Sequence, residues 1–314
     1  MNPDQIRSHK AFDTRWYYRL ELAPGLYTPG QDRPPVAQTR ELLRRVDVES
    51  GGTDGGGARC LDVGIQEGLV TILLERRGAA EVVGYDRTFR KGRLALTRRA
   101  LGARFEMVGG MKLQDLPAAL AEAGHGPFDV VIFSGVLYHM FDPLSGLAVV
   151  RGLVRNGGIC IVETTVAFDD SDVMYFNRAG RFTAGAYWFV TPRCLDYLLR
   201  LLRFEPLDVV YQEIDHDDGD APEQGRIAVA CRAVAEPVAE PGDEYIARAK
   251  DINLAEFMDL EAIASDAPEV RYDGSRPNLV TGEAGSVDLQ ASIEATEPLA
   301  AKPEQARLTL EAKY

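Results

Sequence analysis

"LDVGIQEG", residues 61–68, joins a run of buried-strand character to a helical pattern through a glycine-rich turn. Gly64 and Gly68 allow the backbone to turn tightly and to approach a ligand closely, because glycine has no Cβ atom. Gln66 stands between them, in the middle of the glycine series. The stretch alone fits a nucleotide-binding loop with one substitution and an ordinary strand-to-helix turn equally well.

Short runs rich in β-branched residues alternate with helical patterns on both sides of this turn. The predicted strands lie at 59–65, 80–86, 104–109, 128–135 and 158–165, and the predicted helices at 66–77, 88–102, 113–123 and 143–155. The strand runs are almost continuously apolar, which is typical of strands buried on both faces. We therefore predict an α/β fold with five parallel strands and helices on both faces of the sheet.

Two further apolar runs predict how the sheet ends. The runs 206–214 and 226–235 are joined by an acidic loop with no helical pattern between them. Because a parallel connection would need a crossover, the two strands are predicted to form an antiparallel hairpin. Asp142 before Pro143 and Thr191 before Pro192 predict two helix starts, since a capping side chain followed by proline is typical there.

The acidic charge of the chain is concentrated at one end. The 314 residues carry a formal net charge of −13, and residues 233–314, with 17 acidic and 7 basic side chains, account for −10 of it. The rest is nearly neutral, so nothing suggests a nucleic acid held by bulk electrostatics. The first residues show no leader pattern, no run is long enough to span a membrane, and the four cysteines are scattered. We expect reduced cysteines and a cytoplasmic location.

Two carboxylates stand near the glycine-rich turn. Asp86 ends the second strand, 22 residues after Gly64, and a carboxylate about 20 residues after such a turn can hold a ribose. Dinucleotide-binding folds share that spacing. Asp62, however, lies two residues before Gly64, where an acidic group would repel a pyrophosphate and suit a ligand with an amine or a sulfonium. With the terminal hairpin, this favours S-adenosylmethionine over NAD.

Asp-x-Gly at the first strand end, Asp86 at the second and the terminal hairpin together resemble the class I S-adenosylmethionine-dependent methyltransferases. The stretches "FDVVIFSGVLYHMFDPLSGL" (128–147) and "GGICIVET" (157–164) are similar to a narrower branch of that class. This branch includes the tRNA wobble-uridine carboxymethyltransferases and related small-molecule methyltransferases. The resemblance covers about residues 12–235, and Gln66 departs from the usual Gly-x-Gly-x-Gly loop.

The resemblance implies a Rossmann-like fold, and together with the composition of the tail, which lies outside the resemblance, it divides the chain into three parts. Residues 1–34 would form a cap segment, 35–235 the S-adenosylmethionine-binding methyltransferase domain, and 236–314 an acidic extension that is partly helical or loosely ordered. Within these parts we expect helices at about 36–47 and 243–264. Because the sheet is complete by about residue 235, the extension is expected to be dispensable for folding.

The resemblance also assigns residues to the cofactor. Asp62, Gly64 and Gly68 are expected at its methionine end, with Gln66 presenting its backbone or its amide, and Asp86 is expected to hold the ribose. The other expected contacts, at the carboxyl edge of the sheet, are Tyr85, Arg87, Met111, Lys112, Leu113, Ser134, Gly135 and Tyr138.

His139 and Glu163 are the candidate catalytic residues. Either could accept a proton from a hydroxyl group, and histidine has a suitable pKa. Methyl transfer from an activated sulfonium does not require a base, because positioning alone can drive it. His139 could therefore have a structural role instead, either capping the following helix or satisfying a buried carbonyl.

The acceptor side is predicted from aromatic segments. Residues 173–190 are too long for a simple connection and follow the fifth strand, as binding loops and lids do. The candidates are Tyr175, Asn177, Arg178, Tyr187 and Trp188, with Trp16, Tyr17 and Tyr27 from the cap segment. Some of these aromatic side chains are expected only to pack against the body of the protein.

Two charged clusters are predicted to be solvated surface. Six basic residues between 87 and 99 share one predicted helix, and Asp215, His216, Asp217, Asp218 and Asp220 lie at the hairpin tip. We predict no metal site at either place.

These observations predict methyl transfer to a small metabolite, with O-methylation of a natural-product-like acceptor as the preferred chemistry. Carboxymethylation of a tRNA wobble uridine is an alternative, although "RLELAPGLYTPG" lacks the lysine of those enzymes and has only Arg19 nearby. A non-catalytic S-adenosylmethionine-binding partner subunit is another. The oligomeric state is left open.

Overall fold

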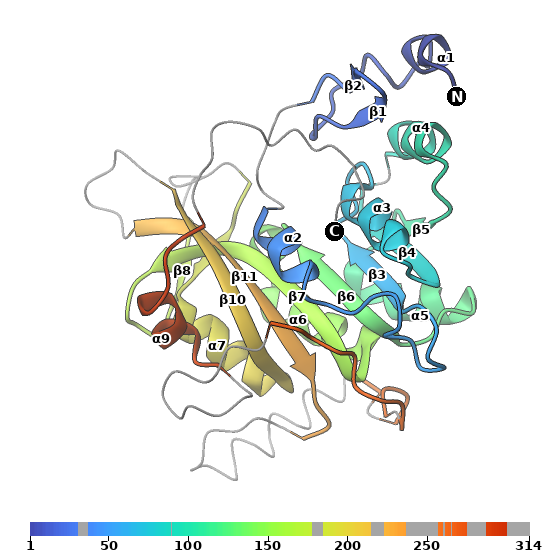
Figure 1. Cartoon of the computed structure of the whole chain (residues 1–314). Helices are drawn as coiled ribbons and strands as arrows, with labels where there is room; N and C mark the ends of the chain where they lie inside the picture. The colour runs from blue at the N-terminus through green and yellow to red at the C-terminus, as the bar shows by residue number, and fades with distance from the viewer. Residues whose placement is uncertain are drawn as a thin grey trace.

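The computed structural model describes residues 1–30, 37–88, 90–177, 185–214, 223–236, 257–259, 261–264, 266–274 and 287–299. A single large sheet runs through the middle of the molecule (Figure 1), with the strand order β10-β11-β7-β6-β3-β4-β5. Its strands are β3 (Arg59–Val63), β4 (Glu81–Asp86), β5 (Glu106–Gly109), β6 (Phe128–Ser134), β7 (Val154–Phe168), β10 (Phe204–Ile214) and β11 (Glu223–Ala233).

The pairing of these strands confirms the predicted sheet. Five strands, from β5 through β4, β3 and β6 to β7, pair in parallel. β10 and β11 form the predicted antiparallel hairpin, and β11 is inserted between β7 and β10. The carboxyl ends of the parallel strands therefore meet at one edge, where ligands of open α/β sheets bind.

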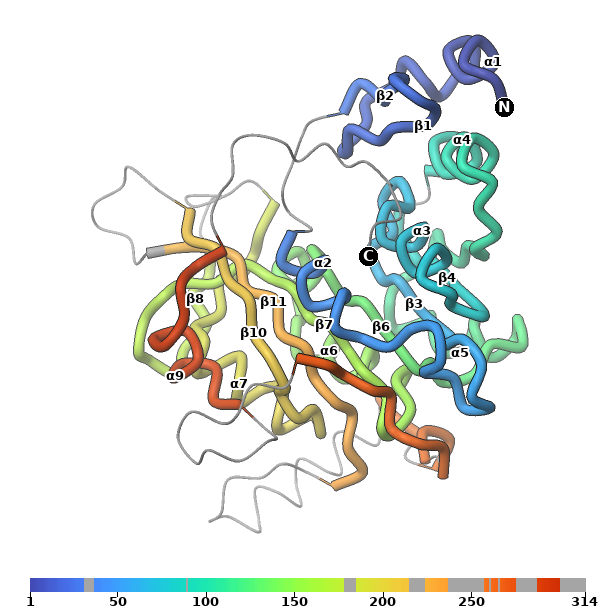
Figure 2. Tube along the Cα trace, in the orientation of Figure 1, coloured from blue at the N-terminus to red at the C-terminus, as the bar shows by residue number. Residues whose placement is uncertain are grey.

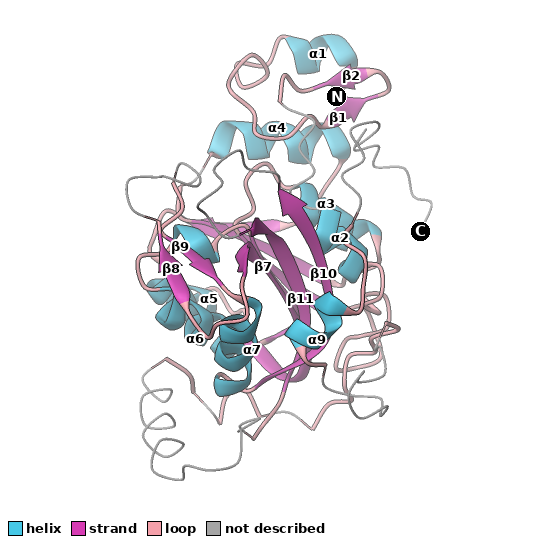
Figure 3. Ribbon diagram, turned by 90° about the vertical axis from the view of Figure 1, so that its left-hand side faces the viewer, coloured by secondary structure: helices cyan, strands magenta, loops and turns pink. Residues whose placement is uncertain are grey.

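Helices cover both faces of the sheet (Figure 3). The described helices are α1 (Pro3–Arg7), α2 (Ala37–Leu43), α3 (Leu69–Arg76), α4 (Lys91–Leu101), α5 (Leu116–Glu122), α6 (Pro143–Leu153), α7 (Pro192–Leu201) and α9 (Leu289–Glu294). One core contains apolar side chains of α2, α3 and α4, and the other contains those of α5, α6, α7 and α9. Burial of these apolar stripes against a two-faced sheet is the main stabilising contribution to such a fold.

Local signals explain where two helices begin. The Asp142 side chain accepts a hydrogen bond from the backbone N–H of Ser145 at the start of α6, and Thr191 accepts from Cys194 at the start of α7. Both helices then begin with a proline, as predicted. Most of the other helices are shorter than predicted, because their first residues form turns that leave the strand ends.

The strand β7 is longer than predicted and reaches from Val154 to Phe168. The additional residues at the C-terminal end of β7 are paired, because β11 pairs with this strand as far as Phe168. The segment after β7 forms the short strands β8 (Met174–Phe176) and β9 (Trp188–Val190), which pair with each other, and β9 also pairs with β7. The predicted acceptor loop is thus partly an added hairpin.

The N-terminal segment forms a small unit beside α4 (Figures 1 and 3). It contains α1 and the two-stranded sheet of β1 (Glu21–Ala23) and β2 (Leu26–Tyr27). Ile6, Trp16 and Leu20 are buried in the core that α3 and α4 also share. The Trp16 indole N–H donates to the backbone of Ala11 and Phe12, so this side chain is structural.

The described parts of the C-terminal extension pack on the sheet domain, as the red end of the tube in Figure 2 shows for α9. Val270 and Tyr272 join one core, while Leu289 and Ile293 join the other. The Tyr272 hydroxyl donates to the buried carboxylate of Asp208 over 3.1 Å. The division at residue 236 stays a prediction, but these contacts give the extension a share in stabilising the domain.

Two predicted features lie wholly or mainly outside the described residues. The acidic hairpin tip at 215–220 is one, and the helix at 243–264 is the other, of which only 257–259 and 261–264 are described. Within the described part of the chain, no helix is both long and apolar enough to cross a membrane.

Candidate active site

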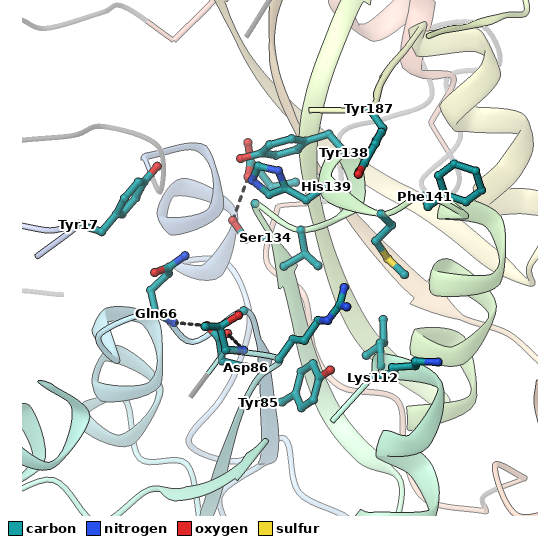
Figure 4. Close-up of a pocket in the computed structure, with 18 of the residues that line it drawn as sticks. Tyr17, Gln66, Tyr85, Asp86, Lys112, Ser134, Tyr138, His139, Phe141 and Tyr187 are labelled. Carbon is teal, nitrogen blue, oxygen red and sulfur yellow. Dashed lines mark hydrogen bonds between the residues drawn. The ribbon is translucent and has the colours of Figure 1, made fainter. Parts of the chain in front are cut away.

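A cavity of about 550 Å³ opens at the carboxyl edge of the parallel strands. Its volume is in the range of small-molecule sites. Figure 4 shows Gln66 and Asp86 on one side of it, and Tyr138, His139 and Tyr187 across from them. The cavity thus has a wall built by the ends of β3 and β4 and a second wall built by the segments that follow β6 and β7.

The glycine-rich turn has left-handed backbone at three alternating positions. Gly64, Gln66 and Gly68 have φ angles of 97°, 49° and 87°. A Cβ atom on Gly64 would lie 2.5 Å from the Val136 side chain, so glycine is required there by space as well as by backbone conformation. Gln66 therefore adopts the backbone of the missing glycine, at a cost of about 1 kcal/mol or more for a residue with a side chain.

Hydrogen bonds hold Gln66 in this conformation. Its backbone N–H donates to the carboxylate of Asp86 over 3.3 Å, and its side-chain oxygen accepts from Arg90 over 2.6 Å. Residue 66 thus keeps the left-handed backbone conformation that a glycine would adopt readily, although Gln66 has a side chain. The side-chain oxygen of Gln66 is bound to Arg90, just before α4, and its backbone N–H is turned to the Asp86 carboxylate.

Asp86 lies in the cavity wall at the end of β4. Its second carboxylate oxygen accepts from the backbone N–H of Thr88 over 2.7 Å. Burial raises the pKa of Asp86, while the two backbone hydrogen bonds and Arg90 act in the opposite direction. A carboxylate fixed by backbone donors and facing a cavity can accept hydrogen bonds from a pair of neighbouring hydroxyl groups.

Asp62 lies behind the turn rather than in the cavity wall. Its side chain is buried, and burial raises its pKa to about 7. One of its carboxylate oxygens has no hydrogen-bond partner among the described residues. A buried carboxylate oxygen of this kind favours a cationic group nearby. Because Asp62 does not line the cavity, the loop would lie between its carboxylate and a ligand in the cavity.

Next to Asp86, the wall of the cavity continues with β4 and the segment after β5. The Tyr85 hydroxyl donates to the backbone carbonyl of Met111 over 2.8 Å, which fixes the turn that carries Lys112 and Leu113. Burial raises the pKa of Tyr85 to about 12, so it stays a hydrogen-bond donor. Tyr85, Arg87, Lys112 and Leu113 line the cavity, whereas Met111 acts through its carbonyl.

A buried polar network forms the far wall. Arg226 of β11 donates to both carboxylate oxygens of Glu163, with distances of 2.6 and 2.8 Å. Ser134 donates to Glu163 over 3.1 Å, and the guanidinium of Arg226 lies 3.4 Å from the Tyr138 hydroxyl. Burial alone would lower the pKa of Arg226, but the Glu163 carboxylate raises it well above its usual range.

This network changes the interpretation of Glu163. Both of its oxygens accept hydrogen bonds from Arg226, so Glu163 holds the guanidinium in place, and its role as a proton acceptor stays a prediction. Arg226 was not predicted from the sequence, because nothing in "QGRIAVA" marks it and only the register of β11 against β7 places it here. Ser134, Gly135 and Tyr138 line the cavity as expected.

His139 lies in the cavity wall with one nitrogen fixed. Its Nδ1 is 2.6 Å from the backbone carbonyl of Gly185, and a carbonyl can only accept. Nδ1 therefore carries the hydrogen, and in the neutral ring Nε2 is the acceptor. One of the two alternatives, a bond to a carbonyl, is thus present, while Nε2 has no hydrogen-bond partner among the described residues.

Aromatic side chains stand at the mouth of the cavity. Tyr187 and Phe141 line it, and their rings meet edge to face at 6.0 Å. Phe141 is 78% exposed and Tyr187 43% exposed, so both rings present apolar surface at the mouth. Tyr17 and Tyr18 of the cap segment line the cavity as well.

Four acceptor candidates do not line the cavity. Tyr27 packs against Arg19 in the N-terminal unit, and Tyr175 donates to Asp169. The Asn177 amide donates to the Ala186 carbonyl, and the Trp188 indole donates to the Phe141 carbonyl, so both hold the added hairpin together. Arg178 lies outside the described residues. Gly68 begins α3 and is not in the cavity wall either.

Comparisons with known proteins define the class. The family described as "Methyltransferase domain" matches residues 36–208. The "Ubiquinone biosynthesis O-methyltransferase" of Ruegeria pomeroyi is 35% identical over 219 residues, which are 66% of this chain and 84% of that protein. The "tRNA U34 carboxymethyltransferase" of Campylobacter hominis is 24% identical over 158 residues, 49% of this chain and 53% of that protein.

A solved structure agrees in fold. The N-terminal domain of EvdMO1, crystallised with SAH bound, superposes with a TM-score of 0.51 at 19% identity and covers 74% of this chain and 98% of that chain. The chain spans less than two thirds of the length of several curated relatives that it matches.

The chain belongs to the methyltransferase-domain family, and its fold is that of the class I S-adenosylmethionine-dependent methyltransferases. S-adenosylmethionine is the cofactor of this class. The cavity suits it because the Asp86 carboxylate, fixed by two backbone donors in the cavity wall, can accept hydrogen bonds from ribose hydroxyls.

Proposed function

We propose that this protein methylates an oxygen atom of a small metabolite. The observation that carries this proposal is the state of His139, which lines the cavity with Nδ1 held by the Gly185 carbonyl and Nε2 left as an acceptor. A histidine in that state can take a proton from a hydroxyl group near neutral pH.

In the proposed reaction the residues of the two walls have separate tasks. When S-adenosylmethionine is bound, it supplies a methyl group on a sulfonium. Asp86 and the 64–68 loop hold the ribose and the methionine end, and the far wall orients the acceptor hydroxyl towards the methyl group. His139 Nε2 would receive the hydroxyl proton as the oxygen attacks the methyl carbon, the methyl carbon–sulfur bond breaks and S-adenosylhomocysteine leaves, and it would later release that proton to solvent.

The shape of the mouth supports a small acceptor with an apolar part. Phe141 and Tyr187 present exposed ring faces and edges, while the Tyr138 hydroxyl and Arg226 offer polar groups deeper in the cavity. An acceptor with a ring or chain and several oxygens, such as a decorated natural product, matches this mixture. Relatives named as ubiquinone biosynthesis O-methyltransferases are consistent with such chemistry.

The test is transfer of a labelled methyl group from S-adenosylmethionine to fractionated small-molecule extracts. We expect label in an organic-soluble product whose mass rises by one methylene unit, with His139→Ala forming it much more slowly. Label that appears on nitrogen or carbon only would overturn the assignment of the methylated atom.

Carboxymethylation of a tRNA wobble uridine is the second candidate, and the similarity to proteins named tRNA U34 carboxymethyltransferase favours it. The cap segment offers Arg19 and no lysine in "RLELAPGLYTPG", which counts against it. Intact-mass analysis of the cofactor that copurifies with the protein separates the two candidates. A carboxylated S-adenosylmethionine in the cavity, together with label in the RNA fraction, would reverse their order.

A further inference from the structure

Glu67, the fourth residue of the glycine-rich turn when Gly64 is counted as the first, is completely buried although it carries a carboxylate. Its Oε1 atom accepts from the backbone N–H of Tyr17 over 3.0 Å and from Arg93 Nη1 over 2.7 Å. Its Oε2 atom has no partner among the described residues. No sequence pattern assigns this glutamate a role, since an exposed turn is the ordinary place for such a side chain.

The partners of Glu67 belong to separate parts of the molecule. Tyr17 is in the cap segment and lines the cavity, as does Tyr18 next to it. Arg93 is on α4 and also donates to the backbone carbonyl of Arg15. Arg90, one turn earlier, donates to the side chain of Gln66 and lies 3.6 Å from Glu67. The cap, the cofactor loop and α4 therefore meet at one carboxylate.

Stability alone does not account for this arrangement. A buried ion pair loses the hydration of both charges, and well-packed apolar side chains usually stabilise a fold as well or better. The Oε2 atom, which lacks a partner in the described chain, adds to that cost. What Glu67 provides is a direct link from the loop that shapes one wall of the cavity to the segment that covers it.

We propose that Glu67 is a positioning residue that fastens residues 15–18 to the cofactor loop, so that the cap closes over the cavity only when the loop has the conformation seen here. Gln66 in this conformation donates its backbone N–H to Asp86, so the ribose-side carboxylate, the loop and the cap form one coupled unit. Because coupling between sites is reciprocal, cofactor bound at the loop stabilises the closed cap, and the closed cap slows cofactor release. This inference rests on the cofactor of the family and is independent of the acceptor proposed above.

Glu67→Gln tests the link, because the amide keeps the size of the side chain and an oxygen for Tyr17 but removes the charge that binds Arg93. Two measurements do not depend on turnover. Calorimetry should show S-adenosylmethionine binding weakened about tenfold, within the usual range of coupling between sites. Trypsin should cleave the wild-type chain after the exposed Arg15 more slowly when cofactor is present, and this protection should disappear in the variant.

Glu81→Gln is the matched control. Glu81 is a partly buried carboxylate that pairs with Arg59 over 2.8 Å, and it lies at the start of β4, at the other end of the strand that finishes with Asp86. Its loss should lower the melting temperature without changing cofactor affinity or protection after Arg15. Arg93→Gln, at a less buried position, serves if Glu67→Gln does not fold. It should reproduce the weaker binding, and the double variant should be no worse than either single one.

The proposal is overturned if Glu67→Gln or Arg93→Gln binds cofactor within twofold of wild type and keeps the protection after Arg15. Equal losses of affinity in Glu81→Gln would also overturn it, because the effect would then be a general result of removing a buried ion pair.

Discussion

The two walls of the cavity are built from residues at very different separations in the chain. On the wall built by the ends of β3 and β4, here called the cofactor wall, Gln66 and Asp86 are 20 residues apart, and the backbone N–H of Gln66 donates to the Asp86 carboxylate. On the far wall, Glu163 and Arg226 are 63 residues apart, Tyr138 and Arg226 are 88 apart, and both contacts are between side chains. The first wall follows from one β-turn-α-β unit, whereas the second exists only after the strands have assembled in register.

The largest expected effect is on the far wall. Arg226→Ala leaves the buried carboxylate of Glu163 without its cation, and breaking a buried pair in this way costs about 3–5 kcal/mol. Urea denaturation should show a loss of that size. Adding Glu163→Gln to Arg226→Ala removes the uncompensated charge and should recover much of the loss. If Arg226→Ala costs less than about 1 kcal/mol, water already reaches the pair and the wall is not a closed network.

The cofactor wall is easier to predict from the sequence than the far wall, because the residues that define it lie close together in the chain. The strand ends, the spacing from Gly64 to Asp86 and the hairpin after residue 206 are sufficient to predict the turn, the ribose-side carboxylate and the antiparallel end of the sheet. The need for glycine in a tight turn and the pattern of apolar residues along a strand both depend on residues that are close together in the chain. Both can therefore be recognised in a single sequence.

Only part of the far wall could be predicted in the same way, since Ser134, Tyr138 and His139 line the cavity as expected. Arg226 and Phe141 carry no local mark, and the four aromatic or amide candidates Tyr27, Tyr175, Asn177 and Trp188 are used in internal hydrogen bonds or packing. Which side of the added hairpin faces the cavity depends on the pairing of β8 and β9, and residue types alone do not set that register. Glu67 shows the same limit on the cofactor side, since its partners lie in distant segments.

The next expected effect concerns the proton. His139→Ala removes the free Nε2 acceptor and should lower turnover by about 100-fold while cofactor affinity stays unchanged. His139→Gln keeps a group that can donate to the Gly185 carbonyl and serves as the matched control for loop position. A loss smaller than about threefold in both variants would mean that positioning carries the reaction and that His139 is structural.

The buried carboxylate behind the turn predicts a pH dependence of stability. The pKa of Asp62 is raised from 3.8 to about 7 in the folded protein, so the folded state holds a proton that the unfolded state releases between these values. The free energy of unfolding therefore falls as pH rises through this window and is constant above it. Asp62→Asn removes that fall and should gain on the order of 4 kcal/mol over wild type at pH 8 relative to pH 4, because each pKa unit corresponds to about 1.4 kcal/mol. Parallel melting curves across pH would contradict the raised pKa.

The smallest expected effect is at Gln66. Gln66→Gly removes the side chain from a left-handed position and should stabilise the protein by about 1 kcal/mol, with cofactor affinity changed less than about threefold. Thermal melting and calorimetry measure the two quantities. A loss of stability instead would show that the hydrogen bond from Arg90 to the Gln66 side chain outweighs the strain.

The central claim is that the cavity holds S-adenosylmethionine with its ribose on Asp86, and calorimetric titration of the cofactor into wild type and Asp86→Ala tests it most directly. The ribose hydroxyls lose their acceptor in the variant, so its affinity should fall by about 100-fold or more. The protein should stay folded, with a lower melting temperature because the backbone N–H groups of Gln66 and Thr88 also lose their acceptor. An affinity within about threefold of wild type in a folded Asp86→Ala protein would contradict the assignment and place the cofactor elsewhere.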